Sequence, residues 1–312
     1  MERKRVLVTG GAGYVGSVLV PELLSKGFEV TVLDNLSYNN GRCILQNFYS
    51  NHFQFVKGDI RDRVLVDKLV GQADHIIHLA AIVGYPACRK DERLAQEVNV
   101  IGTENIARAV QPHQTIQFAS TGSVYGAIGE TCTEETVANP LTIYGKNKLD
   151  AENILKEHCT PIIYRFATAF GLAGRLRMDL MINDFVYQAI HTKHLIVYEK
   201  HFRRTFIHVR DIARVFVHGL EKYEEMKGQT YNVGHETMNY TKEDIVNKIR
   251  ARVPFYLHFA EFAKDQDQRD YEVNYQKIRA TGFETKISMD TGLRELMDAL
   301  EIVTIPNPYS NI

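Results

Sequence analysis

Three glycines between a short apolar run and a helical pattern constrain the fold of this chain more than any other feature. The run Arg5–Val8 ends just before Gly10, Gly13 and Gly16, and apolar residues recur at helical spacing over Tyr14–Ser25. Glycine is needed where a chain turns tightly or must lie close to another group. A strand that passes through such a loop into a helix is the first part of a β–α–β unit, in which the next strand runs parallel to the first.

A carboxylate at the end of the second predicted strand indicates what the glycine loop can hold. The strand Phe28–Leu33 leads into Asp34, which lies 18 residues past Gly16. Glycines let the backbone approach a pyrophosphate, whose charge then lies against the N-terminus of the helix. A carboxylate at this distance accepts hydrogen bonds from the adenosine ribose and repels a 2′-phosphate. The pattern therefore predicts NAD as the cofactor, in preference to NADP.

The rest of the first half continues this alternation of strands and helices. Further strands are predicted at Phe53–Val56, His75–Leu79, Ile116–Ala119 and Pro161–Phe166, with helices at Arg63–Leu69, Glu92–Val110 and Gly145–Glu157. Alternating elements of this kind predict the α/β class, with a Rossmann-type doubly wound parallel sheet that carries helices on both faces.

The pattern changes after Gly171. Helices are predicted at Asp179–Ile190, Asp211–Tyr223, Lys242–Arg250 and Thr291–Leu300, and short strands at Leu195–Val197, Thr205–His208 and Thr230–Val233. No linker rich in Gly, Ser or Pro precedes them, so we expect a smaller α/β lobe packed on the sheet domain. We expect residues 1–171, with a return segment at about 205–234, to form the sheet domain. Residues 172–204 and 235–312 would then form the lobe, with an irregular stretch from 305 to 312.

Composition excludes several classes of partner. At 312 residues, 45% of them hydrophobic, the chain can bury one large core or two modest ones. A net charge of −1 would not attract nucleic acid or an anionic membrane, and no apolar run approaches the roughly 18–20 residues of a membrane span. The four cysteines lack paired spacing and the twelve histidines form no metal motif. We therefore expect a cytoplasmic protein with reduced thiols that binds no metal, nucleic acid or membrane.

A tyrosine, a lysine and a threonine form the predicted catalytic set. Tyr144 and Lys148 are one helical turn apart, and Thr121 follows the fifth predicted strand. A tyrosine has a pKa near 10, so it accepts a proton at neutral pH only if nearby positive charge stabilises its ionised form. Lys148 would supply that charge from the same helix face and would also hold the nicotinamide ribose. The Thr121 hydroxyl would bond the reacting oxygen, and the set could then oxidise an alcohol.

Small and polar residues follow the third and fourth predicted strands. Asp59 would either cap a helix or bond the adenine amino group. Ala80 and Ala81 leave space for a dinucleotide to lie against the backbone, whereas His78 is predicted to be a packed strand residue.

Taken together, these motifs resemble those of the extended short-chain dehydrogenases/reductases, in the branch that acts on nucleotide-diphosphate sugars. The resemblance covers nearly the whole chain. It rests on the glycine loop, Asp34, Asp59, His78–Ala81, Asn99–Thr103, Ser120–Gly126, Tyr144 with Lys148, and Phe206–Asp211. It implies that the sheet domain binds NAD, that the lobe binds a nucleotide sugar, and that the protein is a homodimer or a higher homo-oligomer. The predicted cofactor-binding residues are Gly10, Gly13, Tyr14, Val15, Gly16, Asp34, Asn35, Asp59, Ile60, Leu79, Ala80, Ala81, Asn99, Tyr144 and Lys148.

The residues after Thr121 discriminate between reactions within this family. Sugar 4,6-dehydratases carry Asp-Glu there, because elimination of water needs an acid and a base, and UDP-glucuronate decarboxylases resemble this chain but carry Glu at the second position. This chain has Gly122 and Ser123. The resemblance thus implies oxidation at C4 of the sugar without elimination.

The later segments are most similar to a bacterial group of GDP-manno-heptose 4-dehydrogenases, enzymes of polysaccharide biosynthesis that release a 4-keto sugar. A UDP-hexose type of 4-epimerase is the alternative, although Thr168 replaces the Asn that many 4-epimerases carry. A 4,6-dehydratase and a non-catalytic NAD-binding regulator are further alternatives, but such regulators usually lose the Tyr or the Lys.

Substrate contacts are predicted mainly from charge. A diphosphate favours arginine, and Arg204 matches the family's phosphate-binding arginine, with Arg269 as a second candidate. Asp179 and Asn183 are predicted to border the sugar or phosphate site, and Thr121 and Thr168 complete the predicted substrate set. Three more arginines, Arg175, Arg177 and Arg203, are as consistent with a solvated basic face as with substrate contact.

Overall fold

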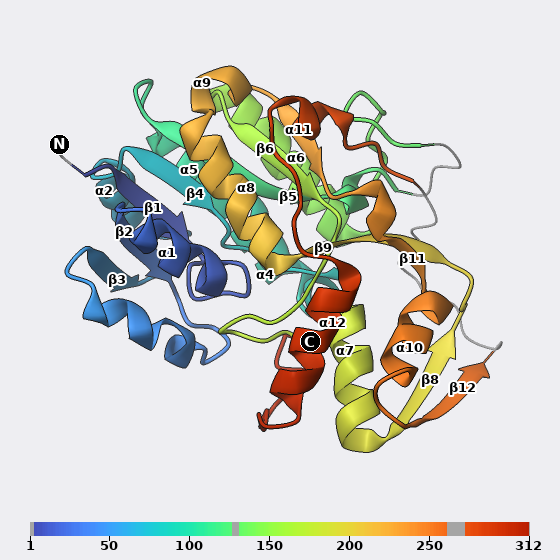
Figure 1. The fold of residues 1–312 in the computed structure, drawn as a ribbon. Helices are drawn as coiled ribbons and strands as arrows, with labels where there is room; N and C mark the ends of the chain where they lie inside the picture. The colour runs from blue at the N-terminus through green and yellow to red at the C-terminus, as the bar shows by residue number, and fades with distance from the viewer. Residues whose placement is uncertain (1–2, 127–130, 261–271, 312) are drawn as a thin grey trace.

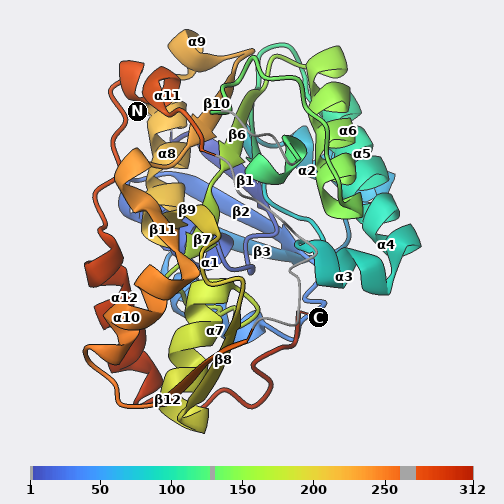
Figure 2. The same ribbon diagram turned by 90° about the vertical axis from the view of Figure 1, so that its right-hand side faces the viewer.

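A parallel seven-stranded sheet forms the centre of the computed structural model, which describes residues 3–126, 131–260 and 272–311. Every pairing within this sheet is parallel. In sheet order the strands are β10 (Thr230–Val233), β6 (Ile162–Phe166), β5 (Thr115–Thr121), β4 (His75–His78), β1 (Arg5–Thr9), β2 (Glu29–Asp34) and β3 (Phe53–Lys57). The fold prediction is therefore confirmed: the sheet is of the Rossmann type (Figures 1 and 2).

Helices cover both faces of this sheet, because each face presents a continuous apolar surface. Two buried clusters result, one on each face. One face carries α1 (Gly16–Ser25), α8 (Val209–Glu221), α9 (Tyr223–Met226) and α11 (Gln276–Ala280). The other carries α2 (Arg63–Val70), α5 (Gly102–Ala109) and α6 (Ile143–His158). Figure 2 shows these two helical layers on opposite sides of the strands.

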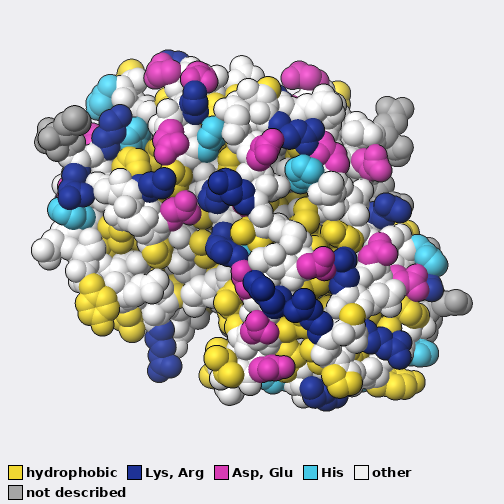
Figure 3. All heavy atoms as spheres, in the orientation of Figure 1, with side chains coloured by type: hydrophobic (Ala, Val, Ile, Leu, Met, Phe, Trp, Pro, Cys, Tyr) yellow, Lys and Arg dark blue, Asp and Glu magenta, His cyan; other side chains and the backbone are white. Residues whose placement is uncertain are grey.

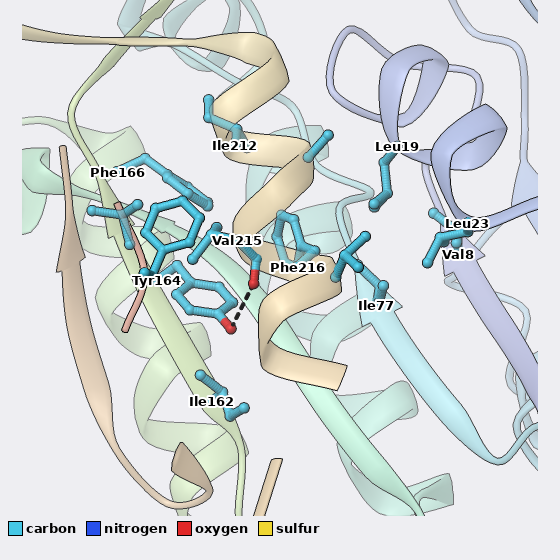
Figure 4. Close-up of a cluster of buried hydrophobic side chains, with 14 of the residues drawn as sticks. Val8, Leu19, Leu23, Ile77, Ile162, Tyr164, Phe166, Ile212, Val215 and Phe216 are labelled. Carbon is cyan, nitrogen blue, oxygen red and sulfur yellow. Dashed lines mark hydrogen bonds between the residues drawn. The ribbon is translucent and has the colours of Figure 1, made fainter. Parts of the chain in front are cut away.

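The core under α8 shows how the first layer is held. Figure 4 shows Phe216 of α8 between Tyr164 of β6 and Leu19 of α1. The Tyr164 hydroxyl donates a hydrogen bond to the backbone oxygen of Val215 at 3.3 Å, so this buried polar group has a partner. Burial of this cluster fixes α8, a helix distant in sequence, against the first β–α–β unit.

A second lobe lies below the sheet domain in Figure 1. It has its own buried core, in which Phe170, Ile182, Phe206 and Leu293 pack together. The lobe contains a three-stranded sheet, β11 (Asn239–Thr241), β9 (Arg203–His208) and β7 (Thr168–Phe170), and a two-stranded one, β12 (Tyr256–Ala260) and β8 (His194–Tyr198). Its helices are α7 (Met181–Tyr187), α10 (Lys242–Arg250) and α12 (Met289–Leu300).

Short elements complete the fold. Two helices, α3 (Tyr85–Lys90) and α4 (Glu92–Gln96), precede α5, and a π-helical segment at Glu97–Ile101 joins α4 to α5, so the predicted helix Glu92–Val110 is interrupted in this way. A second π-helical segment, Gln188–Thr192, extends α7. Within the described residues, 3-10 segments lie at Gly41–Tyr49, Gly122–Val124 and Glu236–Met238.

The predicted return segment divides between the two parts of the fold. Its helix α8 and strand β10 join the sheet domain, whereas its first strand, β9, belongs to the separate three-stranded sheet. Strand β9 pairs in parallel with β7, which follows β6 directly in the chain. Segments 168–170 and 203–208 thus connect the two parts at the point where the sheet ends.

The surface carries charges of both signs. Acidic and basic side chains are interspersed over the face drawn in Figure 3. None of the helices within the described ranges has the length and apolarity that a membrane span requires. In the same part of the chain, no group of three or more His, Cys, Asp or Glu residues is placed to hold a metal ion.

Candidate active site

A cavity of about 980 Å³ lies at the carboxyl ends of the parallel strands, where ligands of open α/β sheets bind. Residues that follow or end six of the seven strands line it: Gly10 (β1), Asp34 (β2), Asp59 (β3), Leu79 (β4), Thr121 (β5) and Thr168 (after β6). Lobe residues, among them Asp179, Tyr198, Arg204 and Tyr309, line it from the other side. The cavity therefore lies between the sheet domain and the lobe.

The glycine loop at the start of α1 has the geometry of a pyrophosphate cradle. Gly10 has φ +71°, and a Cβ on it would lie 2.7 Å from the backbone nitrogen and Cα of Ala80. A Cβ on Gly16 would lie 2.5 Å from the backbone of Gly11. No side chain caps the N-terminus of α1, and its first turn has no acidic residue. The N-terminal amides thus remain free of side-chain acceptors, and they fit an anionic group.

Asp34 is held where a ribose would be recognised. Its Oδ2 accepts a hydrogen bond from the backbone N–H of Ala12 at 3.0 Å, and its Oδ1 accepts one from Leu36 at 2.9 Å. Burial raises the pKa of this carboxyl group, although the two backbone bonds oppose that effect. Each oxygen keeps a free lone pair, which can accept from the two adenosine ribose hydroxyls.

The loop after β3 lies beside Asp34. Asn35 donates to Asp59 Oδ2 at 3.1 Å, and Arg61 forms an ion pair with Asp59 at 3.0 Å. Asp59 caps no helix, because Asp62 is the residue that accepts from the backbone of α2. Asp59 and Ile60 line the cavity, which leaves the adenine contact as the remaining prediction for Asp59.

Two predicted contact residues lie away from the cavity wall. Asn99, a predicted cofactor residue, is buried and exchanges hydrogen bonds with both backbone groups of Ile82, so it supports the loop after β4. Asn183, a predicted substrate residue, is fully buried and binds the backbone of Gly171 and Arg177. Neither lines the cavity, because backbone groups in the adjoining loops already occupy these amides.

His78 is a polar residue near the site that has a structural role. His78 is fully buried between the hydroxyls of Thr9 and Thr103, at 2.7 and 3.0 Å. Burial lowers its pKa to about 3, so it stays neutral. It does not line the cavity, in agreement with the packed position predicted from the sequence.

The three predicted catalytic residues all line the cavity. Tyr144 and Lys148 lie in the first turns of α6, which Thr142 caps by accepting from the N–H of Gly145 at 3.2 Å. The Lys148 Nζ donates to the backbone oxygen of Ala119 at 2.8 Å and lies 4.5 Å from the centre of the Phe118 ring. Burial lowers the pKa of Lys148 to about 8, so the side chain is still mostly charged at neutral pH.

The end of β5 is braced from behind the cavity. Thr121 lies 3.0 Å from the hydroxyl of Ser123, at the turn that follows the strand. Behind it, Ser120 donates to Glu152 at 2.5 Å, and Glu152 forms a buried ion pair with Arg165 at 2.7 Å. Glu152 is one turn beyond Lys148 on α6, so this network fixes the strand end against the helix that carries the predicted base.

The lobe side of the cavity carries most of its charged side chains. Thr168, Asp179 and Arg204, three residues of the predicted substrate set, line it, and Arg269 lies outside the described residues. Arg177 and Asp179 form an ion pair at 2.5 Å, and each side chain is only 9% exposed. Burial opposes the charge of Arg177, but the charges of Asp179 and Tyr144 outweigh it and raise its pKa. A guanidinium group thus acts electrostatically on the predicted base.

Several lining residues were not predicted from the sequence. Tyr38 and Asn40 come from the loop after β2, Lys242 from the start of α10, and Tyr309 and Asn311 from the segment predicted only to be irregular. Arg175 and Arg177 also line the cavity, and their burial excludes a solvated basic face for them. For Asn40 and Asn311, an amide residue in an irregular stretch was the sequence signal available.

Comparisons with known proteins agree with this geometry. The model of the NAD dependent epimerase/dehydratase family matches residues 6–234. The low-salt glycan biosynthesis protein Agl12 of Haloferax volcanii is 32% identical over 94% of this chain and 97% of its own length. UDP-glucose 4-epimerase 2 of Arabidopsis thaliana is 28% identical over 74% of this chain and 76% of its own length.

A solved structure extends the similarity to the whole fold. The UDP-glucuronic acid 4-epimerase of Bacillus cereus, in complex with UDP-glucuronic acid and NAD, superposes with a TM-score of 0.85 at 25% identity. The superposition covers 95% of this chain and 98% of that one.

Proposed function

The chain belongs to the NAD dependent epimerase/dehydratase family, and from that premise we propose that it is a nucleotide-sugar 4-epimerase that acts on a UDP-hexose type of substrate. The cofactor is NAD, for which the glycine loop and Asp34 provide the fitting cradle. Relatives that act at the same sugar position, from Arabidopsis thaliana and Bacillus cereus, support the epimerase over the 4-dehydrogenase expected from the sequence.

One observation carries the proposal. Tyr144, Lys148 and Thr121 line the same cavity as both the glycine loop and the lobe residues, so they lie where a sugar bound to the lobe would meet the cofactor. The turn after Thr121 contains Gly122 and Ser123, and neither has a carboxyl group. The set can therefore remove a proton from a hydroxyl group, but this turn supplies no acid–base pair for elimination of water.

Proton transfer is the part of the reaction that these residues perform. We expect the ionised Tyr144 to take the proton of the C4 hydroxyl, while Thr121 donates a hydrogen bond to the reacting oxygen. The buried ammonium group of Lys148 stabilises the phenolate, and Arg177 adds a second positive charge on the lobe side. Bound NAD would accept the hydride from C4 and could give it back. If the 4-keto sugar rotates and the hydride then returns to the other face of C4, Tyr144 gives the proton back to the oxygen, and the product is the epimer.

The 4-dehydrogenase remains a second candidate because of Thr168. This residue lines the cavity next to the catalytic set and replaces the Asn that many 4-epimerases carry. If the ketone leaves before it rotates, the product is a free 4-keto sugar, as the predicted resemblance to GDP-manno-heptose 4-dehydrogenases implies.

A panel of nucleotide sugars separates these outcomes. The NAD-loaded protein is incubated with UDP-, GDP-, CDP- and dTDP-sugars, and the products are analysed by mass spectrometry and by sugar composition. A UDP-sugar converted to an isomer of equal mass supports the proposal. A product two mass units lighter supports the 4-dehydrogenase, and a loss of 18 mass units contradicts both.

A further inference from the structure

Arg175 lies directly over the first turn of α1. Its backbone N–H donates to the Ser17 hydroxyl at 3.1 Å, and Ser17 is the second residue of that helix. The guanidinium carbon lies 4.6 Å from the centre of the Tyr38 ring, in the loop after β2. The side chain is only 9% exposed and lines the main cavity. A segment of the lobe thus brings a guanidinium group to the cofactor end of the cavity.

No carboxylate of the described residues pairs with this guanidinium group. None of the ion pairs between described residues includes Arg175, and its guanidinium group donates to the neutral amide oxygen of Asn311. The nearby Asp179 is already paired with Arg177 at 2.5 Å, and Asp34 accepts from two backbone amides. Arg175 and Arg177 are both buried, but the only carboxylate paired with either of them among the described residues is that of Asp179. A buried cation without a counter-ion is costly, so the site favours an anionic ligand.

We propose that Arg175 binds the pyrophosphate of NAD. The uncapped amides at the N-terminus of α1 and the guanidinium group of Arg175 would then approach the pyrophosphate from two sides. A planar guanidinium group can donate two parallel hydrogen bonds to phosphate oxygens, which a helix N-terminus alone does not provide. Arg175 is then a residue of the lobe that binds the cofactor.

Asn311 positions this arginine. Its amide oxygen accepts from Arg175, and its Nδ2 donates to Asp179 Oδ1 at 3.0 Å. Two residues earlier, the Tyr309 hydroxyl donates to Asp184 at 2.7 Å, which fixes the segment to α7. Figure 2 shows this last stretch of chain passing α7, and Tyr309 and Asn311 within it line the cavity. The segment therefore holds Arg175 at the boundary between the cofactor and the sugar.

Binding measurements made without the nucleotide-sugar substrate test this inference. Isothermal titration calorimetry of protein freed of nucleotide compares NAD, ADP-ribose, adenosine and UDP. For Arg175→Gln we expect a Kd for NAD and ADP-ribose that is about 10- to 100-fold higher, because charge-assisted hydrogen bonds are lost. Adenosine and UDP should bind as they do to the unmodified protein. Arg42→Gln, which removes an exposed arginine from the nearby 3-10 segment, should change nothing.

Three results would overturn the inference. They are unchanged NAD affinity in Arg175→Gln, an equal loss for adenosine, or a larger loss for UDP than for NAD. The last of these would assign Arg175 to the sugar nucleotide. If Arg175→Gln does not fold, Arg175→Lys provides the test, since a point charge without the planar fork should still weaken ADP-ribose several-fold. The inference needs only NAD binding, so failure of the 4-epimerase proposal leaves it standing, and its own failure leaves that proposal intact.

Discussion

The two ends of the cavity are built in different ways. At the cofactor end, the glycine loop, Asp34 and Ala80 follow three neighbouring strands, and they offer mainly backbone groups at fixed positions. At the sugar end, the wall consists of side chains such as Asp179, Arg204 and Tyr309, from segments far apart in the sequence. The cofactor end is thus defined by the first β–α–β unit and the strand beside it, and the sugar end by how the lobe packs. Arg175 is an exception, because it belongs to the lobe but lies at the cofactor end.

Because the two ends are built from different segments, binding of NAD and binding of the sugar nucleotide should be separable by mutation. A change in the glycine loop should affect NAD before anything else, and a change in the lobe wall should affect the sugar nucleotide alone. The catalytic residues lie between the two ends, and loss of the Tyr144 hydroxyl should affect either binding step much less than turnover. The following predictions test that separation in order of decreasing effect.

Removal of the Tyr144 hydroxyl should have the largest effect. In Tyr144→Phe the proton acceptor is lost while the ring and its packing remain, so we expect turnover to fall by about 10³-fold. NAD and UDP should bind with nearly unchanged affinity. Steady-state kinetics and calorimetry measure these quantities separately, and a variant that turns over normally would refute the catalytic assignment.

A methyl group in the glycine loop should have the next largest effect, confined to the cofactor end. In Gly10→Ala the new Cβ would lie 2.7 Å from the backbone of Ala80, in a residue with φ +71°. We expect NAD affinity to fall by about 100-fold, because the cradle must deform.

Gly228 provides a matched control for that change. It has the same φ of +71°, but nothing lies within 4 Å of a Cβ placed on it. Gly228→Ala should destabilise the protein by about 1 kcal/mol in thermal unfolding and leave NAD binding unchanged. Equal NAD affinity in the two variants would show that the close approach at Gly10 has no role in the cofactor site.

Loss of a lobe arginine should affect only the sugar end. In Arg204→Gln we expect the KM for the sugar nucleotide to rise about 10- to 50-fold with unchanged NAD affinity, since a charged donor to the diphosphate is lost. Arg203→Gln is the control, because Arg203 is exposed on the same strand. If the two variants behave alike, Arg204 does not contact the substrate.

The charge of Lys148 should set the alkaline limit of activity. Burial lowers its pKa to about 8, so the ammonium form is present below that pH and is lost as the pH rises through it. We expect kcat/KM of the NAD-loaded enzyme to fall about tenfold between pH 7 and 9, with the ammonium fraction. A profile that stays level to pH 10 would show that Lys148 need not be charged.

Much of the sheet domain could be predicted because its signals are local. The glycine loop and Asp34 lie within one β–α–β unit, and Tyr144 and Lys148 within one helical turn, so sequence spacing already fixes their relative positions. The helix Lys242–Arg250 was also predicted to its ends, and in the structure Thr241 and Asp244 form a capping box at its start.

The sugar end could not be predicted to the same degree, because its residues meet only through tertiary packing. Asn311 lies in a stretch without periodicity, and its contact with Arg175 spans 136 positions in the sequence. Asn99 and Asn183 were expected to contact ligands, but nearby backbone groups that spacing does not reveal occupy their amides. Strands β7 and β11 have three residues each, too few for a period of two to be recognised.

The central claim is that the hydrogen at C4 leaves the sugar and returns to the same carbon. A UDP-hexose that carries deuterium at C4 tests it most directly, with the product analysed by mass spectrometry and NMR. We expect the C4 epimer at unchanged mass with deuterium retained at C4. A 4-keto product that has lost the deuterium, or a product lighter by 18 mass units, would contradict it.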